Sequence, residues 1–514
     1  MASCMAALGV VAISQLAGDG EWWPHVVGRT AFRVGEIEAM IASIIGLIYL
    51  LFEIAAIVAA GHAVLSSRTP QGSIAWVVAL LSLPLISLPM YLVFGRSRFH
   101  GLVNLRRAGD QQLNRVLNVA QSNALDFVDR FHDEIGNAQV LTRLSHVPFL
   151  RGNDTRLLID GAQTFESMFE AIDGAQEYVL AEFFIVKDDQ LGRQFQSALI
   201  EAARRGCRVY LLFDEVGSQS IRRSYVRQLE EAGVRVSGVK STAGGWVNRF
   251  QLNFRNHRKI VVVDGHVSFV GGLNVGDEYV HRSPRLTPWR DTHLRMEGPA
   301  TLAVQFSFVE DWYWATREIP KLNWSARAAE NADRTVLVLP SGPDDDYETC
   351  GLFFCHAINS ARTRIWIASP YFVPDLQILS ALKLAALRGV DVRVMLPEKA
   401  DHRTVYLASF SYYQNTLPLG IKIYRYTTGF MHQKVFLIDS AYAAVGTANL
   451  DNRSFRLNFE ITLLNYDSNF IKEIEDMLTA DFSRSRPVTI EDYTRKSFFF
   501  KLAVRSKRLL APIL

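Results

Sequence analysis

HRKIVVVDGHVSFVGGLN, residues 257–274, recurs near the other end of the chain as HQKVFLIDSAYAAVGTAN, residues 432–449. Both stretches follow one frame, which is His-x-Lys, four residues, Asp, six residues, and then Gly-x-x-Asn. A single His-x-Lys is common and says little by itself. Two copies with identical internal spacing indicate an internal repeat.

Each copy predicts a strand, because its Lys is followed by an apolar and largely β-branched run, IVVV in the first and VFLI in the second. Successive side chains of a strand alternate between its two faces. His257 and Lys259 are therefore expected to point the same way, as are His432 and Lys434. An imidazole beside an ammonium suits a phosphoryl group, since Lys neutralises oxygen charge while His attacks or transfers protons.

The aspartate of each frame stands at the turn that follows the strand. The turn residues are Asp264-Gly265 and Asp439-Ser440, which predicts a hairpin in both copies. The two aspartates have the opposite strand parity to the His and Lys of their own frame. We therefore expect Asp264 and Asp439 to orient the strand or to form salt bridges, rather than to face a substrate.

The repeat extends beyond these frames. AIDGAQEYVLAEFFIVKD (171–188) matches AINSARTRIWIASPYFVPD (357–375), and QFQSALIEAARRGCRVYLLFDE (194–215) matches ILSALKLAALRGVDVRVMLPEK (378–399). In each, a helical segment leads into an apolar strand, which implies parallel strands buried under helices on both faces. The first half carries extra residues before its histidine, STAGGWVNRFQLNFRN (241–256), which predict a loop at the mouth of the site.

These patterns predict an α/β fold of two domains with mixed, largely parallel sheets flanked by helices. The first domain is expected at residues 150–330 and the second at residues 331–490. A pseudo-two-fold axis would relate the two domains and bring both histidines to one cleft. Neither copy alone holds a complete pair of acid and nucleophile, whereas the two together do.

Two carboxylates occupy corresponding places after the frames. PWRDTHLRMEGP places Asp291 after the first frame, and SFRLNFEITLLN places Glu460 after the second. A carboxylate that accepts a hydrogen bond from imidazole Nδ1 fixes the tautomer and leaves Nε2 for the substrate. The alternative is that each carboxylate only solvates a strand end. Asp277, Glu278 and Ser454 are weaker candidates for the same orienting role.

The N-terminal fifth of the chain is strongly apolar. Residues 39–61 (AMIASIIGLIYLLFEIAAIVAAG) contain one charged residue, and residues 73–95 (SIAWVVALLSLPLISLPMYLVFG) contain none. Each stretch is long enough to cross a bilayer and a short loop joins them, which predicts a two-helix transmembrane hairpin. A pair of buried core helices is the alternative. Pro84 and Pro89 are expected to kink the second helix without breaking it.

The distribution of arginines predicts the orientation of this hairpin. The connecting loop holds only one, whereas several flank the hairpin on both sides, namely Arg29, Arg33, Arg96, Arg98, Arg106 and Arg107. Positive residues favour the cytoplasmic side, so both ends of the hairpin and the large remaining part of the chain are expected to be cytoplasmic. The remaining segments are an N-terminal extension (1–38), the hairpin (39–95), a juxtamembrane connector (96–149) and a C-terminal segment (491–514).

Two of these segments leave alternatives open. The connector begins with basic residues and reads either as a helix against acidic lipid headgroups or as a solvated linker helix. The C-terminal stretch YTRKSFFFKLAVRSKRLLAPIL (493–514) alternates basic and large apolar residues. It is either an interfacial helix that presses the protein onto the bilayer or a helix packed on the second repeat.

Composition excludes several classes of protein. A chain of 514 residues can bury the cores of two or three domains. The formal net charge of +3 is too small to favour a nucleic-acid partner. The four cysteines show neither zinc-ligand spacing nor a disulfide framework, so no metal site is expected from them.

The doubled frame resembles the phospholipase D superfamily, and the chain from residue 39 onward is similar to its bacterial cardiolipin synthases. The narrower resemblance is carried by the apolar hairpin, by GGLNVGDEY after the first frame, and by PYFVP, GFMHQK and the terminal RLLAPIL. It implies a multi-pass enzyme of the inner membrane without cofactor or metal. Its expected partners are phosphatidylglycerol, other membrane phospholipids and the bilayer itself, with no nucleic acid.

The resemblance also implies a mechanism and a set of site residues. His257 would attack the phosphorus of one phosphatidylglycerol while His432 protonates the leaving glycerol, and a second phosphatidylglycerol would then take the phosphatidyl group. The implied catalytic residues are His257, Lys259, Asp264, His432, Lys434 and Asp439, and Asn274 and Asn449 would join the two lysines on the phosphate oxygens. Gly272 departs from the family, since many relatives have serine there. A membrane-bound hydrolase or other phosphodiesterase of the same superfamily is the alternative.

Overall fold

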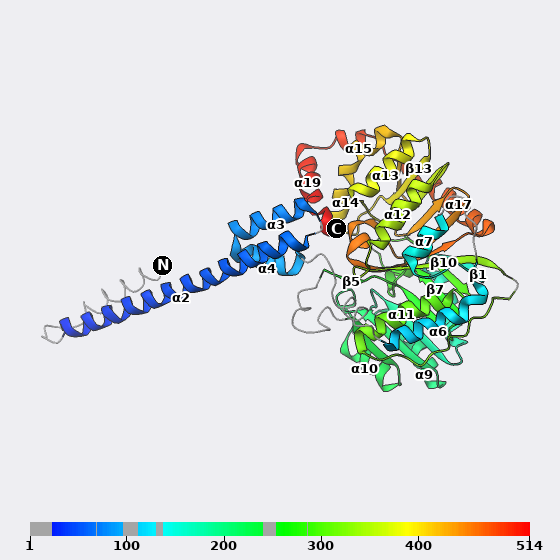
Figure 1. The fold of residues 1–514 in the computed structure, drawn as a ribbon, viewed down its shortest axis with the longest axis horizontal. Helices are drawn as coiled ribbons and strands as arrows, with labels where there is room; N and C mark the ends of the chain where they lie inside the picture. Colours follow the sequence, from blue (N-terminus) through cyan, green and yellow to red (C-terminus); the bar gives the residue numbers. More distant parts are fainter. Residues whose placement is uncertain are drawn as a thin grey trace. The chain divides into compact units, whose positions relative to one another are not determined.

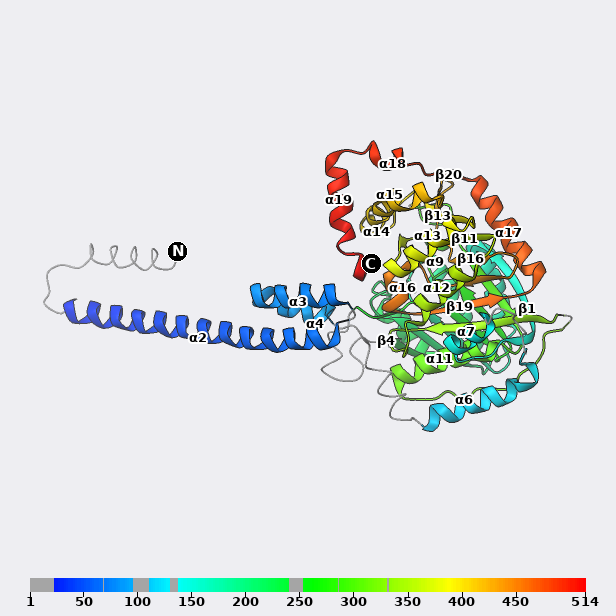
Figure 2. The same ribbon diagram turned by 45° about the horizontal axis from the view of Figure 1, so that its top comes forward.

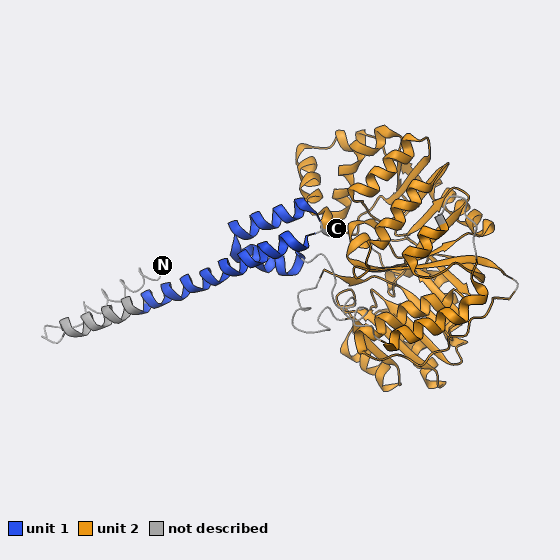
Figure 3. Cartoon of the chain, viewed as in Figure 1, with its two compact units in different colours: residues 1–97 blue, residues 98–514 orange. Residues whose placement is uncertain are grey.

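The computed structural model describes residues 23–67, 69–95, 111–129, 137–239, 253–284, 286–330 and 332–514. The chain divides into two compact units, residues 1–97 and residues 98–514 (Figure 3). The described part of the first unit is helical, and the second unit combines helices with one large sheet. Most of the predicted N-terminal extension, the start of the connector and most of the predicted mouth loop lie outside the described residues.

Among its described residues, the first unit has one helix that is long and apolar enough to cross a membrane. This helix, α2 (Trp23–Ser66), contains the apolar segment Ala39–Ser66 of 28 residues. At 1.5 Å per residue the segment spans about 42 Å, which exceeds the ~30 Å hydrocarbon core of a bilayer. Its large aliphatic side chains, such as Ile45 and Leu51, are exposed. The segment therefore has the length and surface expected of the first predicted span.

The second predicted span is two short helices, so the prediction of one kinked helix over residues 73–95 is wrong. Helices α3 (Pro70–Ser82) and α4 (Pro84–Phe94) fold back on each other. The Tyr91 hydroxyl lies 2.7 Å from His62 Nδ1 near the end of α2, and the Tyr91 ring lies 5.1 Å from the Trp76 ring. In one straight helix, fifteen residues would separate those two rings by about 22 Å. Figures 1 and 2 show α3 and α4 beside the C-terminal part of α2.

Proline chemistry explains this reversal. A residue that precedes proline is disfavoured in the α region, and Leu83 before Pro84 has φ −139° and ψ 62°. Pro84 then begins α4, at the helical position where its missing N–H costs nothing. The Ser87 hydroxyl donates to the Ala79 carbonyl at 2.8 Å across the turn. The sequence prediction assumed a kink, but the backbone leaves the helix altogether.

Small residues on α2 let the α3–α4 pair approach closely. Four alanines of α2 form a buried patch with residues of the other two helices, and its members are Ala56, Ala59, Ala60, Ala63, Leu80 and Tyr91. Small side chains at such a seam permit close helix packing in an apolar environment. The three helices therefore form one packed unit.

One sheet of sixteen strands runs through the second unit. Its order is β20-β14-β13-β11-β16-β17-β19-β10-β1-β9-β7-β6-β2-β3-β4, with β5 beside β19. The strands of the first repeat are β1 (Leu150–Ile159), β2 (Tyr178–Phe183), β3 (Arg208–Asp214), β4 (Arg235–Val239), β5 (Arg255–Asn256), β6 (Ile260–Val263), β7 (Val267–Gly271) and β9 (Thr292–Glu297). Those of the second are β10 (Arg334–Ser341), β11 (Arg364–Ala368), β13 (Asp391–Pro397), β14 (Lys422–Tyr426), β16 (Val435–Ile438), β17 (Tyr442–Gly446), β19 (Asn458–Asn465) and β20 (Ser485–Pro487).

If β20 and β5 are left out, the strands met from one end of the sheet are the repeat equivalents of those met from the other end. Strands β2, β3 and β4 correspond to β11, β13 and β14, and β6, β7 and β9 correspond to β16, β17 and β19. The two halves meet at β1 and β10, which pair antiparallel. This palindromic order confirms the predicted doubling of one α/β unit in a single chain.

The sheet is mixed, as predicted, but the prediction that it is largely parallel is wrong. Parallel pairs are confined to β2–β3–β4, β11–β13–β14 and the short β5–β19 ladder. The remaining neighbours in the sheet are antiparallel, beginning with the motif hairpins β6–β7 and β16–β17. Tight turns join these hairpins, with Asp264 at φ 52° and Asp439 at φ 51°. The strand–helix–strand pattern describes only the three outer parallel strands of each half.

Helices cover both faces of the sheet, as predicted (Figure 1). Val262 of β6 belongs to the core beneath α11 and α17, whereas its neighbour Val261 belongs to the core beneath α8 and α9. The helices of the second unit are α6 (Gln111–Ala124), α7 (Asn137–Ser145), α8 (Asp160–Asp173), α9 (Gln190–Arg204), α10 (Arg223–Glu231), α11 (Thr301–Thr316), α12 (Thr349–Ser360), α13 (Leu376–Leu387), α14 (Arg403–Ser409), α15 (Tyr413–Thr416), α16 (Asn452–Arg456), α17 (Ser468–Ser483), α18 (Glu491–Thr494) and α19 (Phe498–Arg508).

Helix α6 comes from the predicted connector, yet it belongs to the core of the second unit. Leu113 and Ala124 of α6 are buried in the same cluster as Phe308 and Trp312 of α11. This packing contradicts both sequence-based alternatives for that part of the connector, because neither a headgroup-bound helix nor a solvated helix buries such side chains in a protein core.

Candidate active site

Each motif histidine contacts a carboxylate of the other repeat. His257 Nδ1 lies 2.9 Å from Glu460 Oε2, and His432 Nδ1 lies 3.0 Å from Asp291 Oδ2. The two carboxylates are fully buried and the two imidazoles nearly so. The sequence indicated Asp291 and Glu460 as orienting groups without assigning either to a histidine. In the structure each histidine pairs with the carboxylate of the opposite repeat, so each repeat supplies the orienting group for the histidine of the other.

Short backbone ladders place the histidines beside these carboxylates. β5 runs parallel to the start of β19, and His257 N donates to Phe459 O at 2.9 Å. In the same way β15 (Phe430–Met431) runs parallel to β8 (Trp289–Arg290), and His432 N donates to Arg290 O at 2.8 Å. In both cases the accepting carbonyl belongs to the residue just before the carboxylate. The cross-pairing therefore follows from the backbone.

Both imidazoles are neutral near pH 7. Burial lowers the pKa of His257 to about 4, although the Glu460 carboxylate acts in the opposite direction. Burial and then the Lys434 charge lower the pKa of His432. Burial raises the pKa of Glu460, but the charge of His257 and the hydrogen bond from it outweigh this effect, so the pKa ends below its usual value. An Nδ1–H held by a carboxylate leaves Nε2 with a free lone pair.

The two motif lysines lie directly beside their histidines. Lys259 Nζ donates to His257 O at 2.6 Å. Lys434 Nζ donates to His432 O at 2.6 Å and lies 2.7 Å from His432 Nδ1 and 3.2 Å from Nε2. Burial lowers the pKa of Lys259 to about 7 and that of Lys434 to about 8. Two buried ammonium groups without a bound anion repel each other, so the site favours an anion between them.

Aromatic rings, which the motif frame did not predict, hold the imidazoles in place. The Phe184 ring lies 5.2 Å from the His257 ring, and the Trp289 ring lies 5.1 Å from the His432 ring. Trp289 Nε1 also donates to Asp291 Oδ2 at 3.2 Å. The sequence offered one clue to these two rings, which is their position. Phe184 lies in the repeated stretch 171–188, and Trp289 lies two residues before Asp291.

Asp264 and Asp439 anchor the hairpins and lie away from the imidazoles. Asp264 accepts three backbone N–H groups at 2.8 Å from residues 176–178, which lead into β2. Asp439 accepts the corresponding N–H groups of residues 362–364, which lead into β11, at 2.8–2.9 Å. Each carboxylate thus fastens the motif hairpin to the neighbouring strand. This arrangement fits the orienting role suggested by strand parity.

Replacing Asp439 by alanine is expected to destabilise the protein more than it harms chemistry. The change leaves three backbone N–H groups at a strand end without their acceptor, at a cost of about 1–3 kcal/mol in the free energy of unfolding. Chemical denaturation in detergent measures that loss. Asp439→Asn is the matched control and keeps one accepting oxygen. Activity per folded molecule is expected to persist, and its disappearance in Asp439→Ala without any loss of stability would contradict an anchoring role.

Asn274 and Asn449 differ in how their amides are used. Asn274 Oδ1 accepts from Ile185 N at 3.0 Å, and its Nδ2 donates to the Tyr279 hydroxyl at 3.1 Å. Asn449 is also buried, but its Oδ1 has no hydrogen-bond partner among the described residues. The side chain of Asn449 is therefore the more available of the two for a ligand.

The weaker sequence candidates divide into one inside the site and two outside it. The Ser454 hydroxyl donates to Glu460 Oε1 at 2.8 Å and so steadies the partner of His257. Asp277 instead accepts from Leu191 N at 2.8 Å at the start of α9, and Glu278 pairs with a lysine. Only Ser454 therefore has a direct part in orienting a motif histidine.

Comparison with known proteins is consistent with this geometry. The family model "Cardiolipin synthase, PLD-like domain" matches residues 168–283 and 354–482, and "Phospholipase_D-nuclease N-terminal" matches residues 54–96. A "Cardiolipin synthase A" of Pseudomonas fluorescens is 46% identical over 476 residues, which cover 92% of this chain and 98% of the relative. One from Pseudomonas aeruginosa is 47% identical over 478 residues, covering 91% and 96%. The chain belongs to the cardiolipin synthase family.

Membership of the cardiolipin synthase family agrees with the likeness to a solved structure. The phosphatidylserine synthase of Haemophilus influenzae matches with a TM-score of 0.57 at 15% identity, covering 74% of this chain and all of that one. At this identity the match supports the fold alone. Among the described residues, no group of three or more His, Cys, Asp or Glu side chains is arranged to hold a metal ion.

Gly272, the predicted departure from the family pattern, lies against a site carboxylate. A Cβ atom at this position would come within 2.0 Å of Asp291 Oδ1. A side chain at position 272 would therefore clash with the Asp291 carboxylate and push it away from His432. In this member of the cardiolipin synthase family, glycine at 272 makes room for the carboxylate.

Proposed function

We propose that the protein is a cardiolipin synthase, which transfers a phosphatidyl group from one phosphatidylglycerol to the glycerol headgroup of another. The observation that carries this proposal is the crossed pair of neutral histidines, each oriented by a carboxylate of the other repeat, between two buried lysines. A nucleophile opposite a proton donor, with cations for the phosphate oxygens, is what a two-step displacement requires.

In the first step His257 Nε2 attacks phosphorus, a P–N bond forms, and the P–O bond to glycerol breaks. The departing oxygen takes a proton from His432. His432 is neutral in the free site, and the negative phosphodiester favours its protonation when substrate binds. In the second step neutral His432 takes the proton from a headgroup hydroxyl of another phosphatidylglycerol, whose oxygen displaces His257. The products are cardiolipin and glycerol, and no proton is consumed overall.

Lysines and asparagines supply the charge and the donors for this transfer. Lys259 and Lys434 neutralise the non-bridging oxygens, and the Nδ2–H group of Asn449 is assigned as a further donor to the same oxygens, as the resemblance implies. The assignment of His257 as nucleophile comes from the resemblance, because the two histidines are similarly placed.

Product analysis tests the proposal. Purified full-length protein in detergent, given phosphatidylglycerol alone, is expected to release glycerol and form cardiolipin. The His257→Ala variant is the control and should give neither product. Formation of phosphatidic acid without cardiolipin would instead assign the protein to the hydrolases of the superfamily.

The dependence of kcat/KM on pH is expected to be bell-shaped. His257 attacks only when neutral, so activity rises as pH increases through about 4. Two groups act on the alkaline limb, because His432 must be protonated in the first step and Lys259 is charged only below about pH 7, so activity falls as pH rises further. Lys259→Arg keeps its charge and is expected to move the part of the alkaline limb near pH 7 upward. An alkaline limb that does not move in this variant would show that another group controls it.

We also propose that α2 crosses the inner membrane once and that the α3–α4 pair re-enters on the side where α2 ends. Among the described residues, only α2 contains a segment of sufficient length, and Tyr91 near the end of α4 contacts His62 near the end of α2. The predicted multi-pass hairpin is thereby revised. The sequence has Arg68 between α2 and α3 and Arg96 and Arg98 after α4, and positive residues in these segments favour a cytoplasmic location for the catalytic unit.

Cysteine labelling distinguishes one crossing from two. Ile37→Cys lies just before the apolar segment of α2, Leu65→Cys lies at its C-terminal end, and Glu201→Cys marks the catalytic unit. In spheroplasts, a maleimide that cannot cross the membrane is expected to label Ile37→Cys alone, and lysis should expose the other two. A two-helix transmembrane hairpin would instead put Ile37 and Glu201 on one side and Leu65 on the other. Native Cys4 and Cys355 are replaced by serine in all variants.

A further inference from the structure

The C-terminal helix α19 is attached to the second repeat by one side only. The Phe500 ring lies 5.3 Å from the Phe410 ring, and Val504 is fully buried. At the next turn Arg505 Nη2 donates to Gln414 Oε1 at 3.1 Å. Ser497 caps the helix by accepting from Phe500 N. These contacts confirm that α19 packs on the second repeat, which was one of the two sequence-based alternatives.

The opposite side of α19 is apolar and exposed. The α19 stripe is defined as Phe498, Phe499, Leu502 and Leu509, whose exposed fractions are 72%, 78%, 52% and 81%. Single exposed apolar residues are normal on a protein surface, but three large ones on one short helix, with a fourth directly after its end, are not. Packing of α19 on the second repeat therefore does not explain its exposed apolar side.

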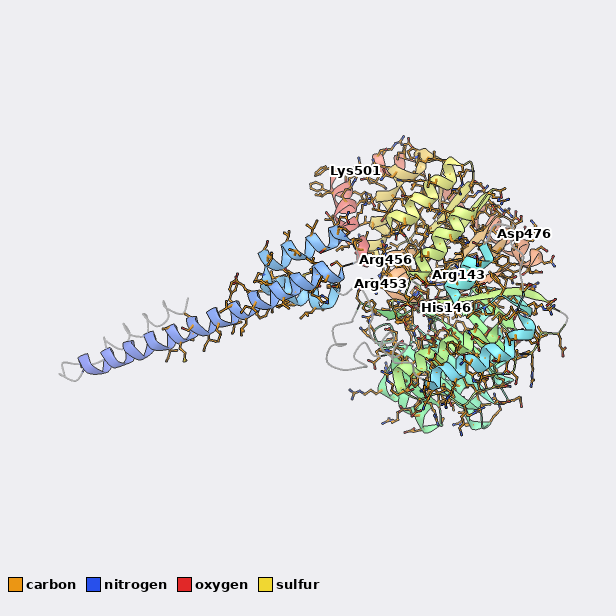
Figure 4. The ribbon with its side chains drawn as sticks, viewed as in Figure 1. Arg143, His146, Arg453, Arg456, Asp476 and Lys501 are labelled. Carbon is orange, nitrogen blue, oxygen red and sulfur yellow. The ribbon has the colours of Figure 1, made fainter. Side chains whose placement is uncertain are left out.

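The residues around the stripe are strongly basic. Residues 495–514 contain six cations and no acidic residue, and the cations are Arg495, Lys496, Lys501, Arg505, Lys507 and Arg508. Figure 4 marks Lys501 on α19, where its Nζ also donates to Thr494 O. A large apolar stripe flanked by Lys and Arg is typical of helices that lie in the interface of an anionic bilayer.

The position of α19 links the stripe to the candidate active site. Helix α19 packs on α14, as Figures 1 and 2 also show. Helix α14 has seven residues, so it is about 10 Å long, and it begins two residues after Asp401. The Asp401 carboxylate accepts from the Tyr371 hydroxyl at 2.5 Å, and its charge acts on His432 and Lys434. Helix α19 therefore packs on the helix that begins beside Asp401, whose charge acts on the candidate active site.

We propose that α19 is a docking helix that inserts the α19 stripe into an anionic phospholipid bilayer. The basic residues then meet the lipid headgroups, and the catalytic unit is held with its site close to the surface in which phosphatidylglycerol lies. This inference rests on the proposed function, since a lipid substrate is the reason to hold the site at a membrane. The apolar anchor α2 brings the chain to the same bilayer.

Depth-dependent quenching in the full-length protein tests the docking. Phe499→Cys carries an environment-sensitive fluorophore, in vesicles of phosphatidylglycerol and phosphatidylcholine that contain a nitroxide on the acyl chain. The same label at Glu201→Cys on α9 is the matched control. Quenching is expected to be several-fold stronger at position 499 and to fall when phosphatidylglycerol is omitted. Equal quenching at the two positions overturns the proposal, as does protection of position 499 by a second copy of the chain.

A paired activity measurement provides the functional test. The double variant Phe498→Ser/Phe499→Ser is expected to lose activity several-fold in vesicles but to keep it in mixed detergent micelles, where docking is not needed. Leu387→Ser removes an exposed leucine from α13 and should change neither assay. Equal losses of the double variant in both assays overturn the proposal. If the parent protein forms no cardiolipin, the proposed function fails, while the quenching measurement still decides the docking.

Discussion

His432→Asn is expected to reduce cardiolipin formation by about 10²- to 10⁴-fold, the usual contribution of general acid–base catalysis. His432 must protonate glycerol in the first step and deprotonate an incoming hydroxyl in the second. Its Nδ1 is held by Asp291 at 3.0 Å, so the other ring nitrogen is the one available for both transfers. His257→Asn removes the nucleophile and should eliminate transfer.

A substrate with a good leaving group separates the two histidines. Phosphatidyl-p-nitrophenol needs no protonation of its departing oxygen, so His432→Asn should still form the P–N bond and then stall. We expect a burst of about one p-nitrophenol per active site, with the phosphatidyl group found on His257 by mass spectrometry. His257→Asn should show no burst. The reverse result, with the adduct on His432, would exchange the two roles.

Alternation along the chain predicted correctly which motif side chains share a face. His257 and Lys259 lie between β5 and β6 and contact each other, and Arg258 between them points to the other side, where its Nη1 donates to Asp311 of α11 at 2.6 Å. In the second repeat, Gln433 Nε2 donates to Asp481 of α17 at 2.8 Å in the same way. Parity of this kind is a local property of a strand, so the sequence contains it.

The partners of the histidines are not a local property. His257 and Glu460 are 203 residues apart, and their contact depends on how the β5–β19 ladder aligns the two repeats. Equivalent positions in the repeats suggested that both carboxylates serve the histidines. They could not show that each one serves the histidine of the opposite repeat.

Backbone reversals explain the errors in the fold. Leu83 leaves the helical region before Pro84, and a kinked helix and a reversed one have the same composition and hydropathy. In the sheet, tight turns at Asp264 and Asp439 create antiparallel hairpins, as the turn residues predicted, whereas the prediction of a largely parallel sheet followed the strand–helix–strand pattern of the flanking units. In both cases a few residues at a turn decided the direction of a long segment.

The crossed pairs make a second strong prediction. Glu460→Gln is expected to reduce cardiolipin formation by about 10²- to 10⁴-fold, because its amide can present an N–H to Nδ1 and disfavour the tautomer that leaves Nε2 free. The change also removes the carboxylate charge that acts to raise the pKa of His257. Since Ser454 and Asn458 also contact Glu460 Oε1, at 2.8 and 3.2 Å, Glu460→Ala would disturb packing more than the isosteric amide.

The p-nitrophenol substrate shows which histidine each carboxylate serves. Glu460 lies in the second repeat but holds His257 in the first, so Glu460→Gln should slow the burst itself. Asp291→Asn should leave the burst intact and slow only the turnover that follows, because Asp291 holds His432. If each carboxylate served the histidine of its own repeat, the two phenotypes would be exchanged. Both variants are expected to unfold at nearly the same temperature as the parent, which would exclude misfolding. The contrast between burst and turnover then shows which carboxylate orients which histidine.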